Sequence, residues 1–322
     1  MLAVAFAALL AAAPAAASKP PEAPGWTEVK DGLGFAAFGG TYPFEQSYLE
    51  LPKGRVRLLL SHGKSGVTRE QLRAWVAQAA QQVAQYYGRF PVELATVTVL
   101  RGDDGEVGGG MAFGGRFVRV LVGTEATQQS LDDDWRMPHE LLHLAFPELE
   151  DRYLYMTEGL STYLEPVIRA QTGQLSQEYA WGGMVLGFPN GLPSREDKGL
   201  DRTHSWGNTY WGGARFWLMV DLEIRLQTKG KKSLEDFLRG VMDAGGSMQS
   251  TWSLEKLFEV AKTSTGTDAL REVHARMGAK RAGFDLDALW KKLGVAMEGR
   301  NVTFDDAAPL AAHRKAITAV RR

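Results

Sequence analysis

The chain has 322 residues, 44% of them hydrophobic and 23% charged, which is the composition of a soluble globular protein of about two domains. Its 37 basic and 38 acidic residues give a net charge of −1, so the charge balance gives no reason to expect nucleic acid as a partner. The sequence contains no cysteine. This excludes disulfides, a cysteine nucleophile and thiolate metal ligands, so a bound zinc ion would have to be held by His, Glu or Asp.

The N-terminal segment is apolar and rich in small residues. Residues 1–17 end in Ala15-Ala16-Ala17, a small-x-small cleavage site, although the basic residues that usually open a signal peptide are missing. The run is too short and too alanine-rich for a membrane-spanning helix. We therefore expect a signal peptide at 1–17, a linker at 18–25 and a secreted or periplasmic protein with no membrane anchor after cleavage.

The next part of the chain alternates strand and helix patterns. Residues 26 to about 60 show apolar runs separated by Gly-rich turns, which is typical of strands. A capping box at Thr68–Gln71 and apolar residues at helical spacing predict an amphipathic helix that ends near Gly88. Two strands are predicted at Val92–Leu100 and Phe117–Val122, and residues 105–110 are predicted to form a loop.

The pattern then becomes helical. Asp132 to Asp134 can cap a helix that tolerates Pro138 near its first turn and runs to about Leu144. A second helix is expected from about 157 to 172. Residues 173–205 carry Gly, Pro and charge and predict a long loop, either a wall or lid beside a site or an ordinary surface excursion.

The remainder is predicted to be almost entirely helical. Further helices are expected at 210–227, after caps at Ser233, Ser253 and Thr267, and at 285–293, with a short final strand at 301–304.

The most informative stretch is His139-Glu140-Leu141-Leu142-His143. Side chains four residues apart lie on the same face of a helix, so both imidazoles can reach one ion, with Glu140 as the base that acts on a zinc-activated water. A third protein ligand is needed, and Glu158, fifteen residues after His143, is the candidate. A surface helix with two histidines and a glutamate need not bind anything, but the Glu158-Gly159 pair at the start of a second helix favours a real site.

Several segments together resemble a known family. The motif His139-Glu140-x-x-His143, the run from Glu158 to Glu165 and the pattern Thr209-Tyr210-x-x-Gly213-Ala214 resemble gluzincin (clan MA) metallopeptidases. The closest resemblance is to the M61 glycyl aminopeptidase family, which is related to the M1 aminopeptidases. The similarity extends over roughly residues 75–317.

This resemblance implies a fold and a set of roles. The fold would be α+β: a thermolysin-like zincin domain with a small mixed sheet and the HExxH helix over 26–172, then a loop and an all-helical C-terminal subdomain over 173–322. One zinc ion would be held by the three ligands His139, His143 and Glu158, with Glu140 as general base and acid. Glu165 would accept an N–H from a ligand histidine, and the Tyr210 hydroxyl would stabilise the oxyanion.

The sequence departs from its relatives at the strand that would hold substrate. Gly109-Gly110-Met111-Ala112 lies where M1 relatives carry Gly-x-Met-Glu-Asn, which makes Gly110, Met111 and Ala112 candidate substrate-binding residues. Ala112 stands where a glutamate would grip the free amine of the substrate. Aminopeptidase and endopeptidase activity therefore both remain open.

Two functions of different classes follow. The first is a zinc metallopeptidase that hydrolyses peptide or protein substrates, with Tyr210, or alternatively His204, as the oxyanion donor. The second is a catalytically weak or inactive zinc-bearing peptide-binding module, in which residues 109–122 add a partner strand. The presence of Glu140 favours the first, because a structural zinc site does not need that residue.

Overall fold

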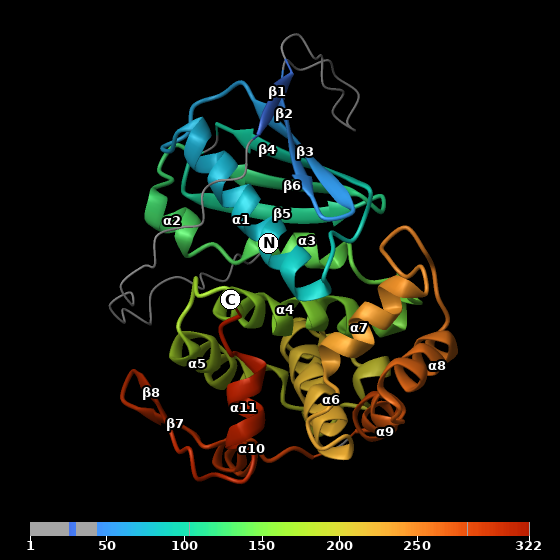
Figure 1. The fold of residues 1–322 in the computed structure, drawn as a ribbon. Coiled ribbons are helices and arrows are strands. Elements are labelled where there is room, and N and C mark those ends of the chain that lie inside the picture. The colour runs from blue at the N-terminus through green and yellow to red at the C-terminus, as the bar shows by residue number, and fades with distance from the viewer. Residues whose placement is uncertain (1–25, 30–43, 103, 282, 322) are drawn as a thin grey trace.

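The structure is a computed structural model that describes residues 26–29, 44–102, 104–281 and 283–321. It is a mixed α+β fold in which a sheet occupies the upper half of Figure 1 and most of the helices occupy the lower half. The predicted signal peptide (1–17) and linker (18–25) lie outside the described residues. Within the described part of the chain, no helix is long and apolar enough to cross a membrane.

One six-stranded mixed sheet forms the upper half of the molecule. Its strands follow the spatial order β1 (Thr27–Val29), β2 (Phe44–Leu51), β3 (Gly54–Ser61), β4 (Leu94–Arg101), β6 (Phe117–Val122) and β5 (Val107–Phe113). The central strands β3, β4 and β6 are parallel, whereas β2 and β5 run antiparallel to their neighbours. The strand β5 is therefore an edge strand of this sheet.

The helix α1 (Arg69–Tyr87) lies between the sheet and the helical half. Its capping box is confirmed, because the side chains of Thr68 and Gln71 each accept a backbone N–H of the other residue. It ends at Gly88, whose φ of 77° is left-handed, as the sequence predicted. Residues on its apolar face contact β2 and β3 on one side and the helices that follow on the other.

The prediction of a loop at 105–110 is wrong, because β5 begins at Val107 and pairs with β6. The run of glycines in this strand serves close packing. A Cβ on Gly108 would lie 2.9 Å from Cβ of Leu121, and a Cβ on Gly110 would meet the side chain of Glu140. A glycine-rich sequence is typical of a turn, so the local pattern concealed the strand.

The helices that follow lie where the two halves meet. They are α2 (Gln128–Asp132), α3 (Arg136–His143), the 3-10 turn η1 (Asp151–Tyr153) and α4 (Leu154–Gln171). The predicted acidic cap acts through Asp134, whose Oδ2 accepts the N–H of Met137 at 2.9 Å in the first turn of α3. The helix α4 begins at Leu154, earlier than the predicted start near residue 157.

The long loop predicted at 173–205 is also wrong in part. It contains α5 (Gln177–Gly187), capped by the Ser176 hydroxyl, and two 3-10 turns, η2 (Phe188–Gly191) and η3 (Leu200–Arg202). Its glycines again permit close contact, since a Cβ on Gly187 would lie 2.0 Å from the ring of Trp211. The remaining residues, 173–176, 192–199 and 203–205, form the irregular part.

The C-terminal part is mostly helical. Its elements are the π-helical turn η4 (Asn208–Gly212), α6 (Gly213–Gln227), α7 (Leu234–Asp243), α8 (Leu254–Thr265), α9 (Ala269–Val273), the π-helical turn η5 (His274–Gly278), α10 (Leu286–Leu293), β7 (Val295–Glu298), β8 (Asn301–Phe304) and α11 (Ala311–Ile317). The caps at Ser233 and Ser253 are confirmed, whereas α9 follows Asp268 in place of Thr267. The final strand is confirmed as β8, and its hairpin with β7 means that this part is not all-helical. The helix α11 was not predicted from the sequence.

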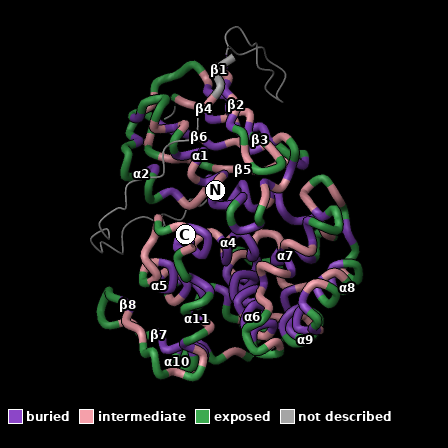
Figure 2. The backbone as a smooth tube through the Cα atoms, in the orientation of Figure 1, coloured by how far each residue is buried: buried purple, intermediate pink, exposed green. Residues whose placement is uncertain are grey.

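The hydrophobic core continues from the sheet into the helical half. Figure 2 shows buried backbone along the strands, through α3 and α4 and into α6. Leu60 and Val99 of the sheet and Trp217 of α6 belong to one cluster and are at most 1% exposed. The helices α3 and α4, which carry the motif residues, therefore lie inside a continuous packed core.

Candidate metal centre

The helix α3 presents both motif histidines to one point. Their ring centroids lie 4.9 Å apart with the planes nearly perpendicular. The buried side chains of Met137, Leu141 and Leu142, each at most 1% exposed, anchor this helix in the core. The helical period thus gives His139 and His143 a shared face whose orientation is fixed by packing.

The helix α4 brings a carboxylate to the same point. Oε2 of Glu158 lies 3.2 Å from Nε2 of His139 and 3.4 Å from Nε2 of His143. A tetrahedral zinc ion with bonds of about 2.0–2.1 Å places neighbouring ligand atoms roughly 3.3 Å apart. The donor types and their separations therefore fit a single zinc ion, and this is the His-His-Glu set that the sequence predicted.

The Glu158 carboxyl and the His143 imidazole shift each other's pKa. Burial alone would raise the pKa of the Glu158 carboxyl, but hydrogen bonds from His139 and His143 hold that pKa well below its usual range. Burial alone would lower the pKa of His143, and the Glu158 carboxylate outweighs this and raises it. Glu158 is consequently ionised at neutral pH, as a metal ligand must be.

Glu140 lies between α3 and the edge strand β5. It is buried, with 9% of its surface exposed. A Cβ on Gly110 would lie 2.9 Å from Cγ and 3.0 Å from Oε1 of Glu140, so the strand backbone passes directly over this carboxylate. A glycine is needed at this position of β5, and any residue with a side chain would displace Glu140.

Tyr210 approaches from the π-helical turn η4. Its ring is stacked against that of His139, with the ring centroids 6.3 Å apart. The centroid of the Trp206 ring lies 5.9 Å from that of the Tyr210 ring. Burial, followed by the charges of Glu158 and Glu140, raises the pKa of the Tyr210 phenol well above its usual value. The hydroxyl therefore remains protonated and can donate a hydrogen bond at neutral pH.

Two contacts of the histidines were missed by the sequence analysis. Oγ of Ser161 lies 3.3 Å from Nδ1 of His143, and the Trp135 ring packs edge-on against His139 at 5.4 Å between centroids. Ser161 follows Glu158 by one helical turn, so the spacing of three residues was the available signal. With Nε2 bound to a metal, Nδ1 of His143 carries the proton, and the Ser161 hydroxyl would accept it.

Glu165 has a different principal partner from the one predicted. Its carboxylate pairs with Arg169 one turn later on α4, and Arg169 also donates to the carbonyl of Asp132 at 2.7 Å. Burial raises the pKa of Glu165, while the charges of Arg169 and His139 act in the opposite direction. The residue is thus close enough to influence His139 electrostatically, and its predicted hydrogen bond to a ligand histidine stays a prediction.

The predicted substrate strand Gly110–Ala112 lies in β5 beside this centre. One side of β5 pairs with β6, with Met111 opposite Arg119 and Ala112 opposite Val118. The sheet order ends at β5, so among the described residues its other side has no partner strand. Met111 is 48% exposed, and His204, the alternative donor, is exposed on the segment before η4.

Solved structures share this fold. An aminopeptidase N family protein from Idiomarina loihiensis superposes with a TM-score of 0.58 at 13% identity, over 78% of this chain and 49% of that one. The fold is thus similar to that of M1 aminopeptidase domains. Comparison with models of known protein families finds no match, and neither does comparison with curated proteins.

Two other matching structures carry bound molecules. One is Legionella pneumophila aminopeptidase A in complex with aspartic acid, with a TM-score of 0.51 at 16% identity. The match covers 76% of this chain and 28% of that one. The other is a mutant M1 zinc metallopeptidase from Deinococcus radiodurans bound to a Tyr-Ser-Ala substrate, with a TM-score of 0.50 at 18% identity. The match covers 76% of this chain and 54% of that one. The chain spans about half the length of the first M1 structures that it matches.

Proposed function

We propose that this protein is a zinc metallopeptidase that hydrolyses peptide bonds, with a thermolysin-like zincin arrangement and closest kinship to the M61 glycyl aminopeptidases. The observation that carries the proposal is the convergence of one ligand atom each from His139, His143 and Glu158 within 4.8 Å of one another, with Oε2 of Glu158 at 3.2 and 3.4 Å from the two Nε2 atoms. A metal site with three protein ligands leaves a fourth position for chemistry. When bound, zinc would act as a Lewis acid toward the scissile carbonyl and make a water molecule more acidic.

The chain's own residues supply the remaining steps. Glu140 takes a proton from the attacking water and later delivers it to the leaving amine. The Tyr210 hydroxyl donates a hydrogen bond to the oxyanion that develops on the carbonyl. Ser161 keeps His143 in the tautomer that leaves Nε2 free.

The side of β5 that has no partner strand among the described residues supports a peptide substrate. An extended peptide can add to an exposed sheet edge through backbone hydrogen bonds, and Gly110 brings that edge against Glu140. Ala112 offers no carboxylate to hold a free amine. We therefore propose that a free N-terminus is not obligatory and that internal peptide bonds are also substrates.

The test is zinc content by mass spectrometry together with cleavage of a mixed peptide library. We expect one equivalent of zinc and cleavage that a chelator abolishes. The Glu140→Gln variant should retain zinc and lose roughly 10²–10⁴-fold in kcat/KM, whereas Glu178→Gln, an exposed change on α5, should behave like the wild type. Full activity of Glu140→Gln would refute the mechanism.

A second candidate is a zinc-bearing peptide-binding module with little or no turnover. Two features favour it: within the described part of the chain no strand pairs with the outer side of β5, and Ala112 carries no carboxylate. Zinc bound without cleavage, together with peptide binding by both the wild type and Glu140→Gln, would select this reading.

Export also remains part of the proposal. It rests on the apolar segment at 1–17, and N-terminal sequencing of the protein released from its native cells would test it: a mature N-terminus near Ser18 is expected.

A further inference from the structure

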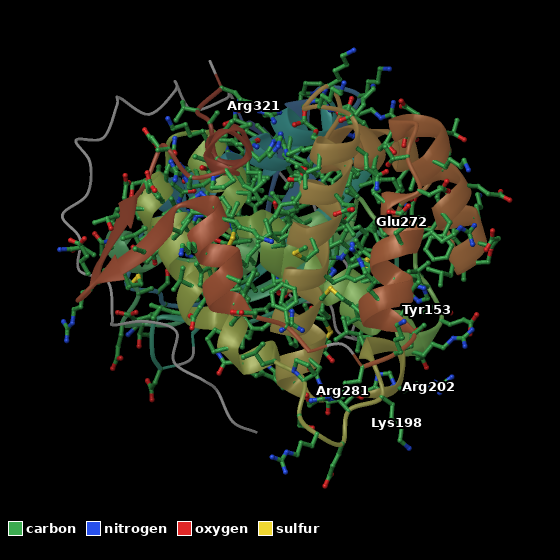
Figure 3. All side chains as sticks on the ribbon, turned by 90° about the horizontal axis from the view of Figure 1, so that it is seen from below. Tyr153, Lys198, Arg202, Glu272, Arg281 and Arg321 are labelled. Carbon is green, nitrogen blue, oxygen red and sulfur yellow. The ribbon has the colours of Figure 1, made fainter. Side chains whose placement is uncertain are left out.

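A second polar site lies apart from the metal centre. A small pocket is enclosed by residues of the 193–200 segment, Asn208 of η4, Arg215 of α6 and the segment that includes Arg281 and Phe284. In Figure 3 the labelled side chains of Lys198, Arg202 and Arg281 lie together at the lower edge of the molecule, next to this segment. The proposed peptidase chemistry uses none of the residues that line the pocket.

Arg215 is the unusual member of the lining. Its side chain comes from the first turn of α6, and the residue is only 3% exposed. Its Nε and Nη1 atoms are buried without a hydrogen-bond partner among the described residues. The guanidinium carbon lies 4.7 Å from the centroid of the Phe284 ring, a contact that leaves those N–H groups unsatisfied.

The one carboxylate in the lining is engaged elsewhere. Oδ1 of Asp197 accepts the Ser194 hydroxyl at 2.7 Å, and its Oδ2 accepts the Ser194 N–H and the Asn208 side-chain amide, both at 3.0 Å. The positive charge of Arg281 also helps to lower the pKa of the Asp197 carboxyl. Arg215 is therefore a buried cation with no acidic partner within the described part of the chain.

Such a cation is costly. Burial lowers the pKa of Arg215 to about 10, so the guanidinium still carries its charge at neutral pH. Water could satisfy its N–H groups but would not neutralise it, and a buried unpaired charge is strongly destabilising. Pro193, Leu200, Met277 and Phe284 make much of the lining apolar, which disfavours a strongly hydrated multivalent anion.

We propose that this pocket binds one small monovalent anion of chloride size, held by the Arg215 guanidinium. The anion completes the hydrogen bonds of Nε and Nη1 and neutralises the charge. Arg281, whose Nε donates to the Ser194 carbonyl at 2.7 Å, adds positive charge at the same pocket. Because Asn208 belongs to the turn that carries Tyr210, the bound anion would join the 193–200 segment to that turn.

The test compares thermal unfolding of the full chain in sodium chloride and in sodium gluconate at equal ionic strength, since gluconate is too large for the pocket. Chloride at roughly 100 times its Kd should raise the Tm by about 5 °C with saturating dependence. Bromide should act like chloride. The Tm measured at increasing sodium formate concentration shows whether the site binds halides alone or also accepts small carboxylates.

Substitutions assign the effect to Arg215. Arg215→Met, which keeps an unbranched side chain, should abolish the chloride response and unfold at the same or a higher temperature than the wild type in gluconate. Arg215→Lys should respond with weaker affinity, as should Arg281→Met. The matched control is Arg276→Met. Arg276 lies in the turn η5, and its Nη2 is 3.7 Å from Oε2 of Glu223. This variant should retain the full chloride response.

Two results would overturn the proposal. One is a wild-type Tm that is equal in chloride and gluconate. The other is an Arg215→Met variant that loses the same stability in both salts, because this would make Arg215 a packing residue only. Bromide soaked into crystals gives a direct check: its anomalous peak should lie beside the Arg215 guanidinium, and a peak elsewhere would refute the assignment.

Discussion

Ser161 and Tyr210 each add one hydroxyl group to a centre whose other members are the two histidines and the carboxylates of Glu158 and Glu140. Ser161 lies on the helix that carries Glu158 and contacts Nδ1 of His143, on the side of the ring away from the ligand atom. Tyr210 lies over His139 and comes from a different part of the chain. At the scale of single residues, Ser161 orients a metal ligand and Tyr210 acts on the substrate. Loss of Ser161 should therefore change zinc affinity, and loss of Tyr210 should change kcat.

Replacing Ser161 by alanine should weaken zinc binding about 10- to 100-fold, because His143 loses the partner that fixes its tautomer. Competition with a chromogenic chelator measures this. Ser264→Ala is the control, since among the described residues the Ser264 hydroxyl donates to carbonyls of α8 alone. Equal zinc affinity of Ser161→Ala and the wild type would contradict the role assigned to Ser161.

Replacing Tyr210 by phenylalanine should leave zinc content unchanged and lower kcat by about 10²–10³-fold, because the ring stays and the donor goes. Steady-state kinetics on a peptide cleaved by the wild type gives the value. His204→Ala belongs in the same experiment. If His204→Ala loses the activity and Tyr210→Phe keeps it, the exposed histidine is the donor.

At the scale of elements, the centre depends on how closely α4 approaches α6. A Cβ on Gly159 would lie 2.3 Å from the Cα of Gly213, and a Cβ on Gly213 would lie 2.1 Å from the carbonyl oxygen of Tyr155. The two helices thus touch backbone to backbone directly after Glu158 and just after the turn of Tyr210. Larger residues at this contact would force the helices apart.

The Gly159→Ala variant should accordingly lose about 1–3 kcal/mol of stability, the usual range for overpacking, and should also lose zinc affinity. Urea unfolding of the metal-free protein isolates the packing effect. Gly183→Ala in α5 is the matched control, because a Cβ there meets nothing within 4 Å. Its higher helix propensity should leave stability equal or raise it by up to about 1 kcal/mol.

The same elements show what the sequence could predict. The spacing of His139 and His143 is a local property of one helix, so the sequence alone could predict that the two side chains share a face. The strand β5 and the helix α5 were missed because Gly110 and Gly187 are glycines required by distant side chains, those of Glu140 and Trp211. A local pattern cannot distinguish a glycine that bends the chain from one that makes room for a neighbour.

At the scale of the whole molecule, a metal bound by α3 and α4 would join two neighbouring helices inside one core. Removing zinc with a chelator should lower the Tm, by about 5 °C relative to zinc at 100 times its Kd. Differential scanning calorimetry records the change. The His139→Ala variant should show no response to the chelator, and an unchanged Tm after verified metal loss from the wild type would contradict this coupling.

The contact between Gly159 and Gly213 also has a mechanical consequence. Helices that meet without intervening side chains cannot slide past one another without a clash, so α4 and the turn that leads into α6 move as one rigid body. Glu158 and Tyr210 belong to that body, whereas Gly110 and its edge strand belong to the sheet. If the protein opens beside β5 to admit a peptide, the hinge must lie between the sheet and the helices, and Glu158 and Tyr210 move together.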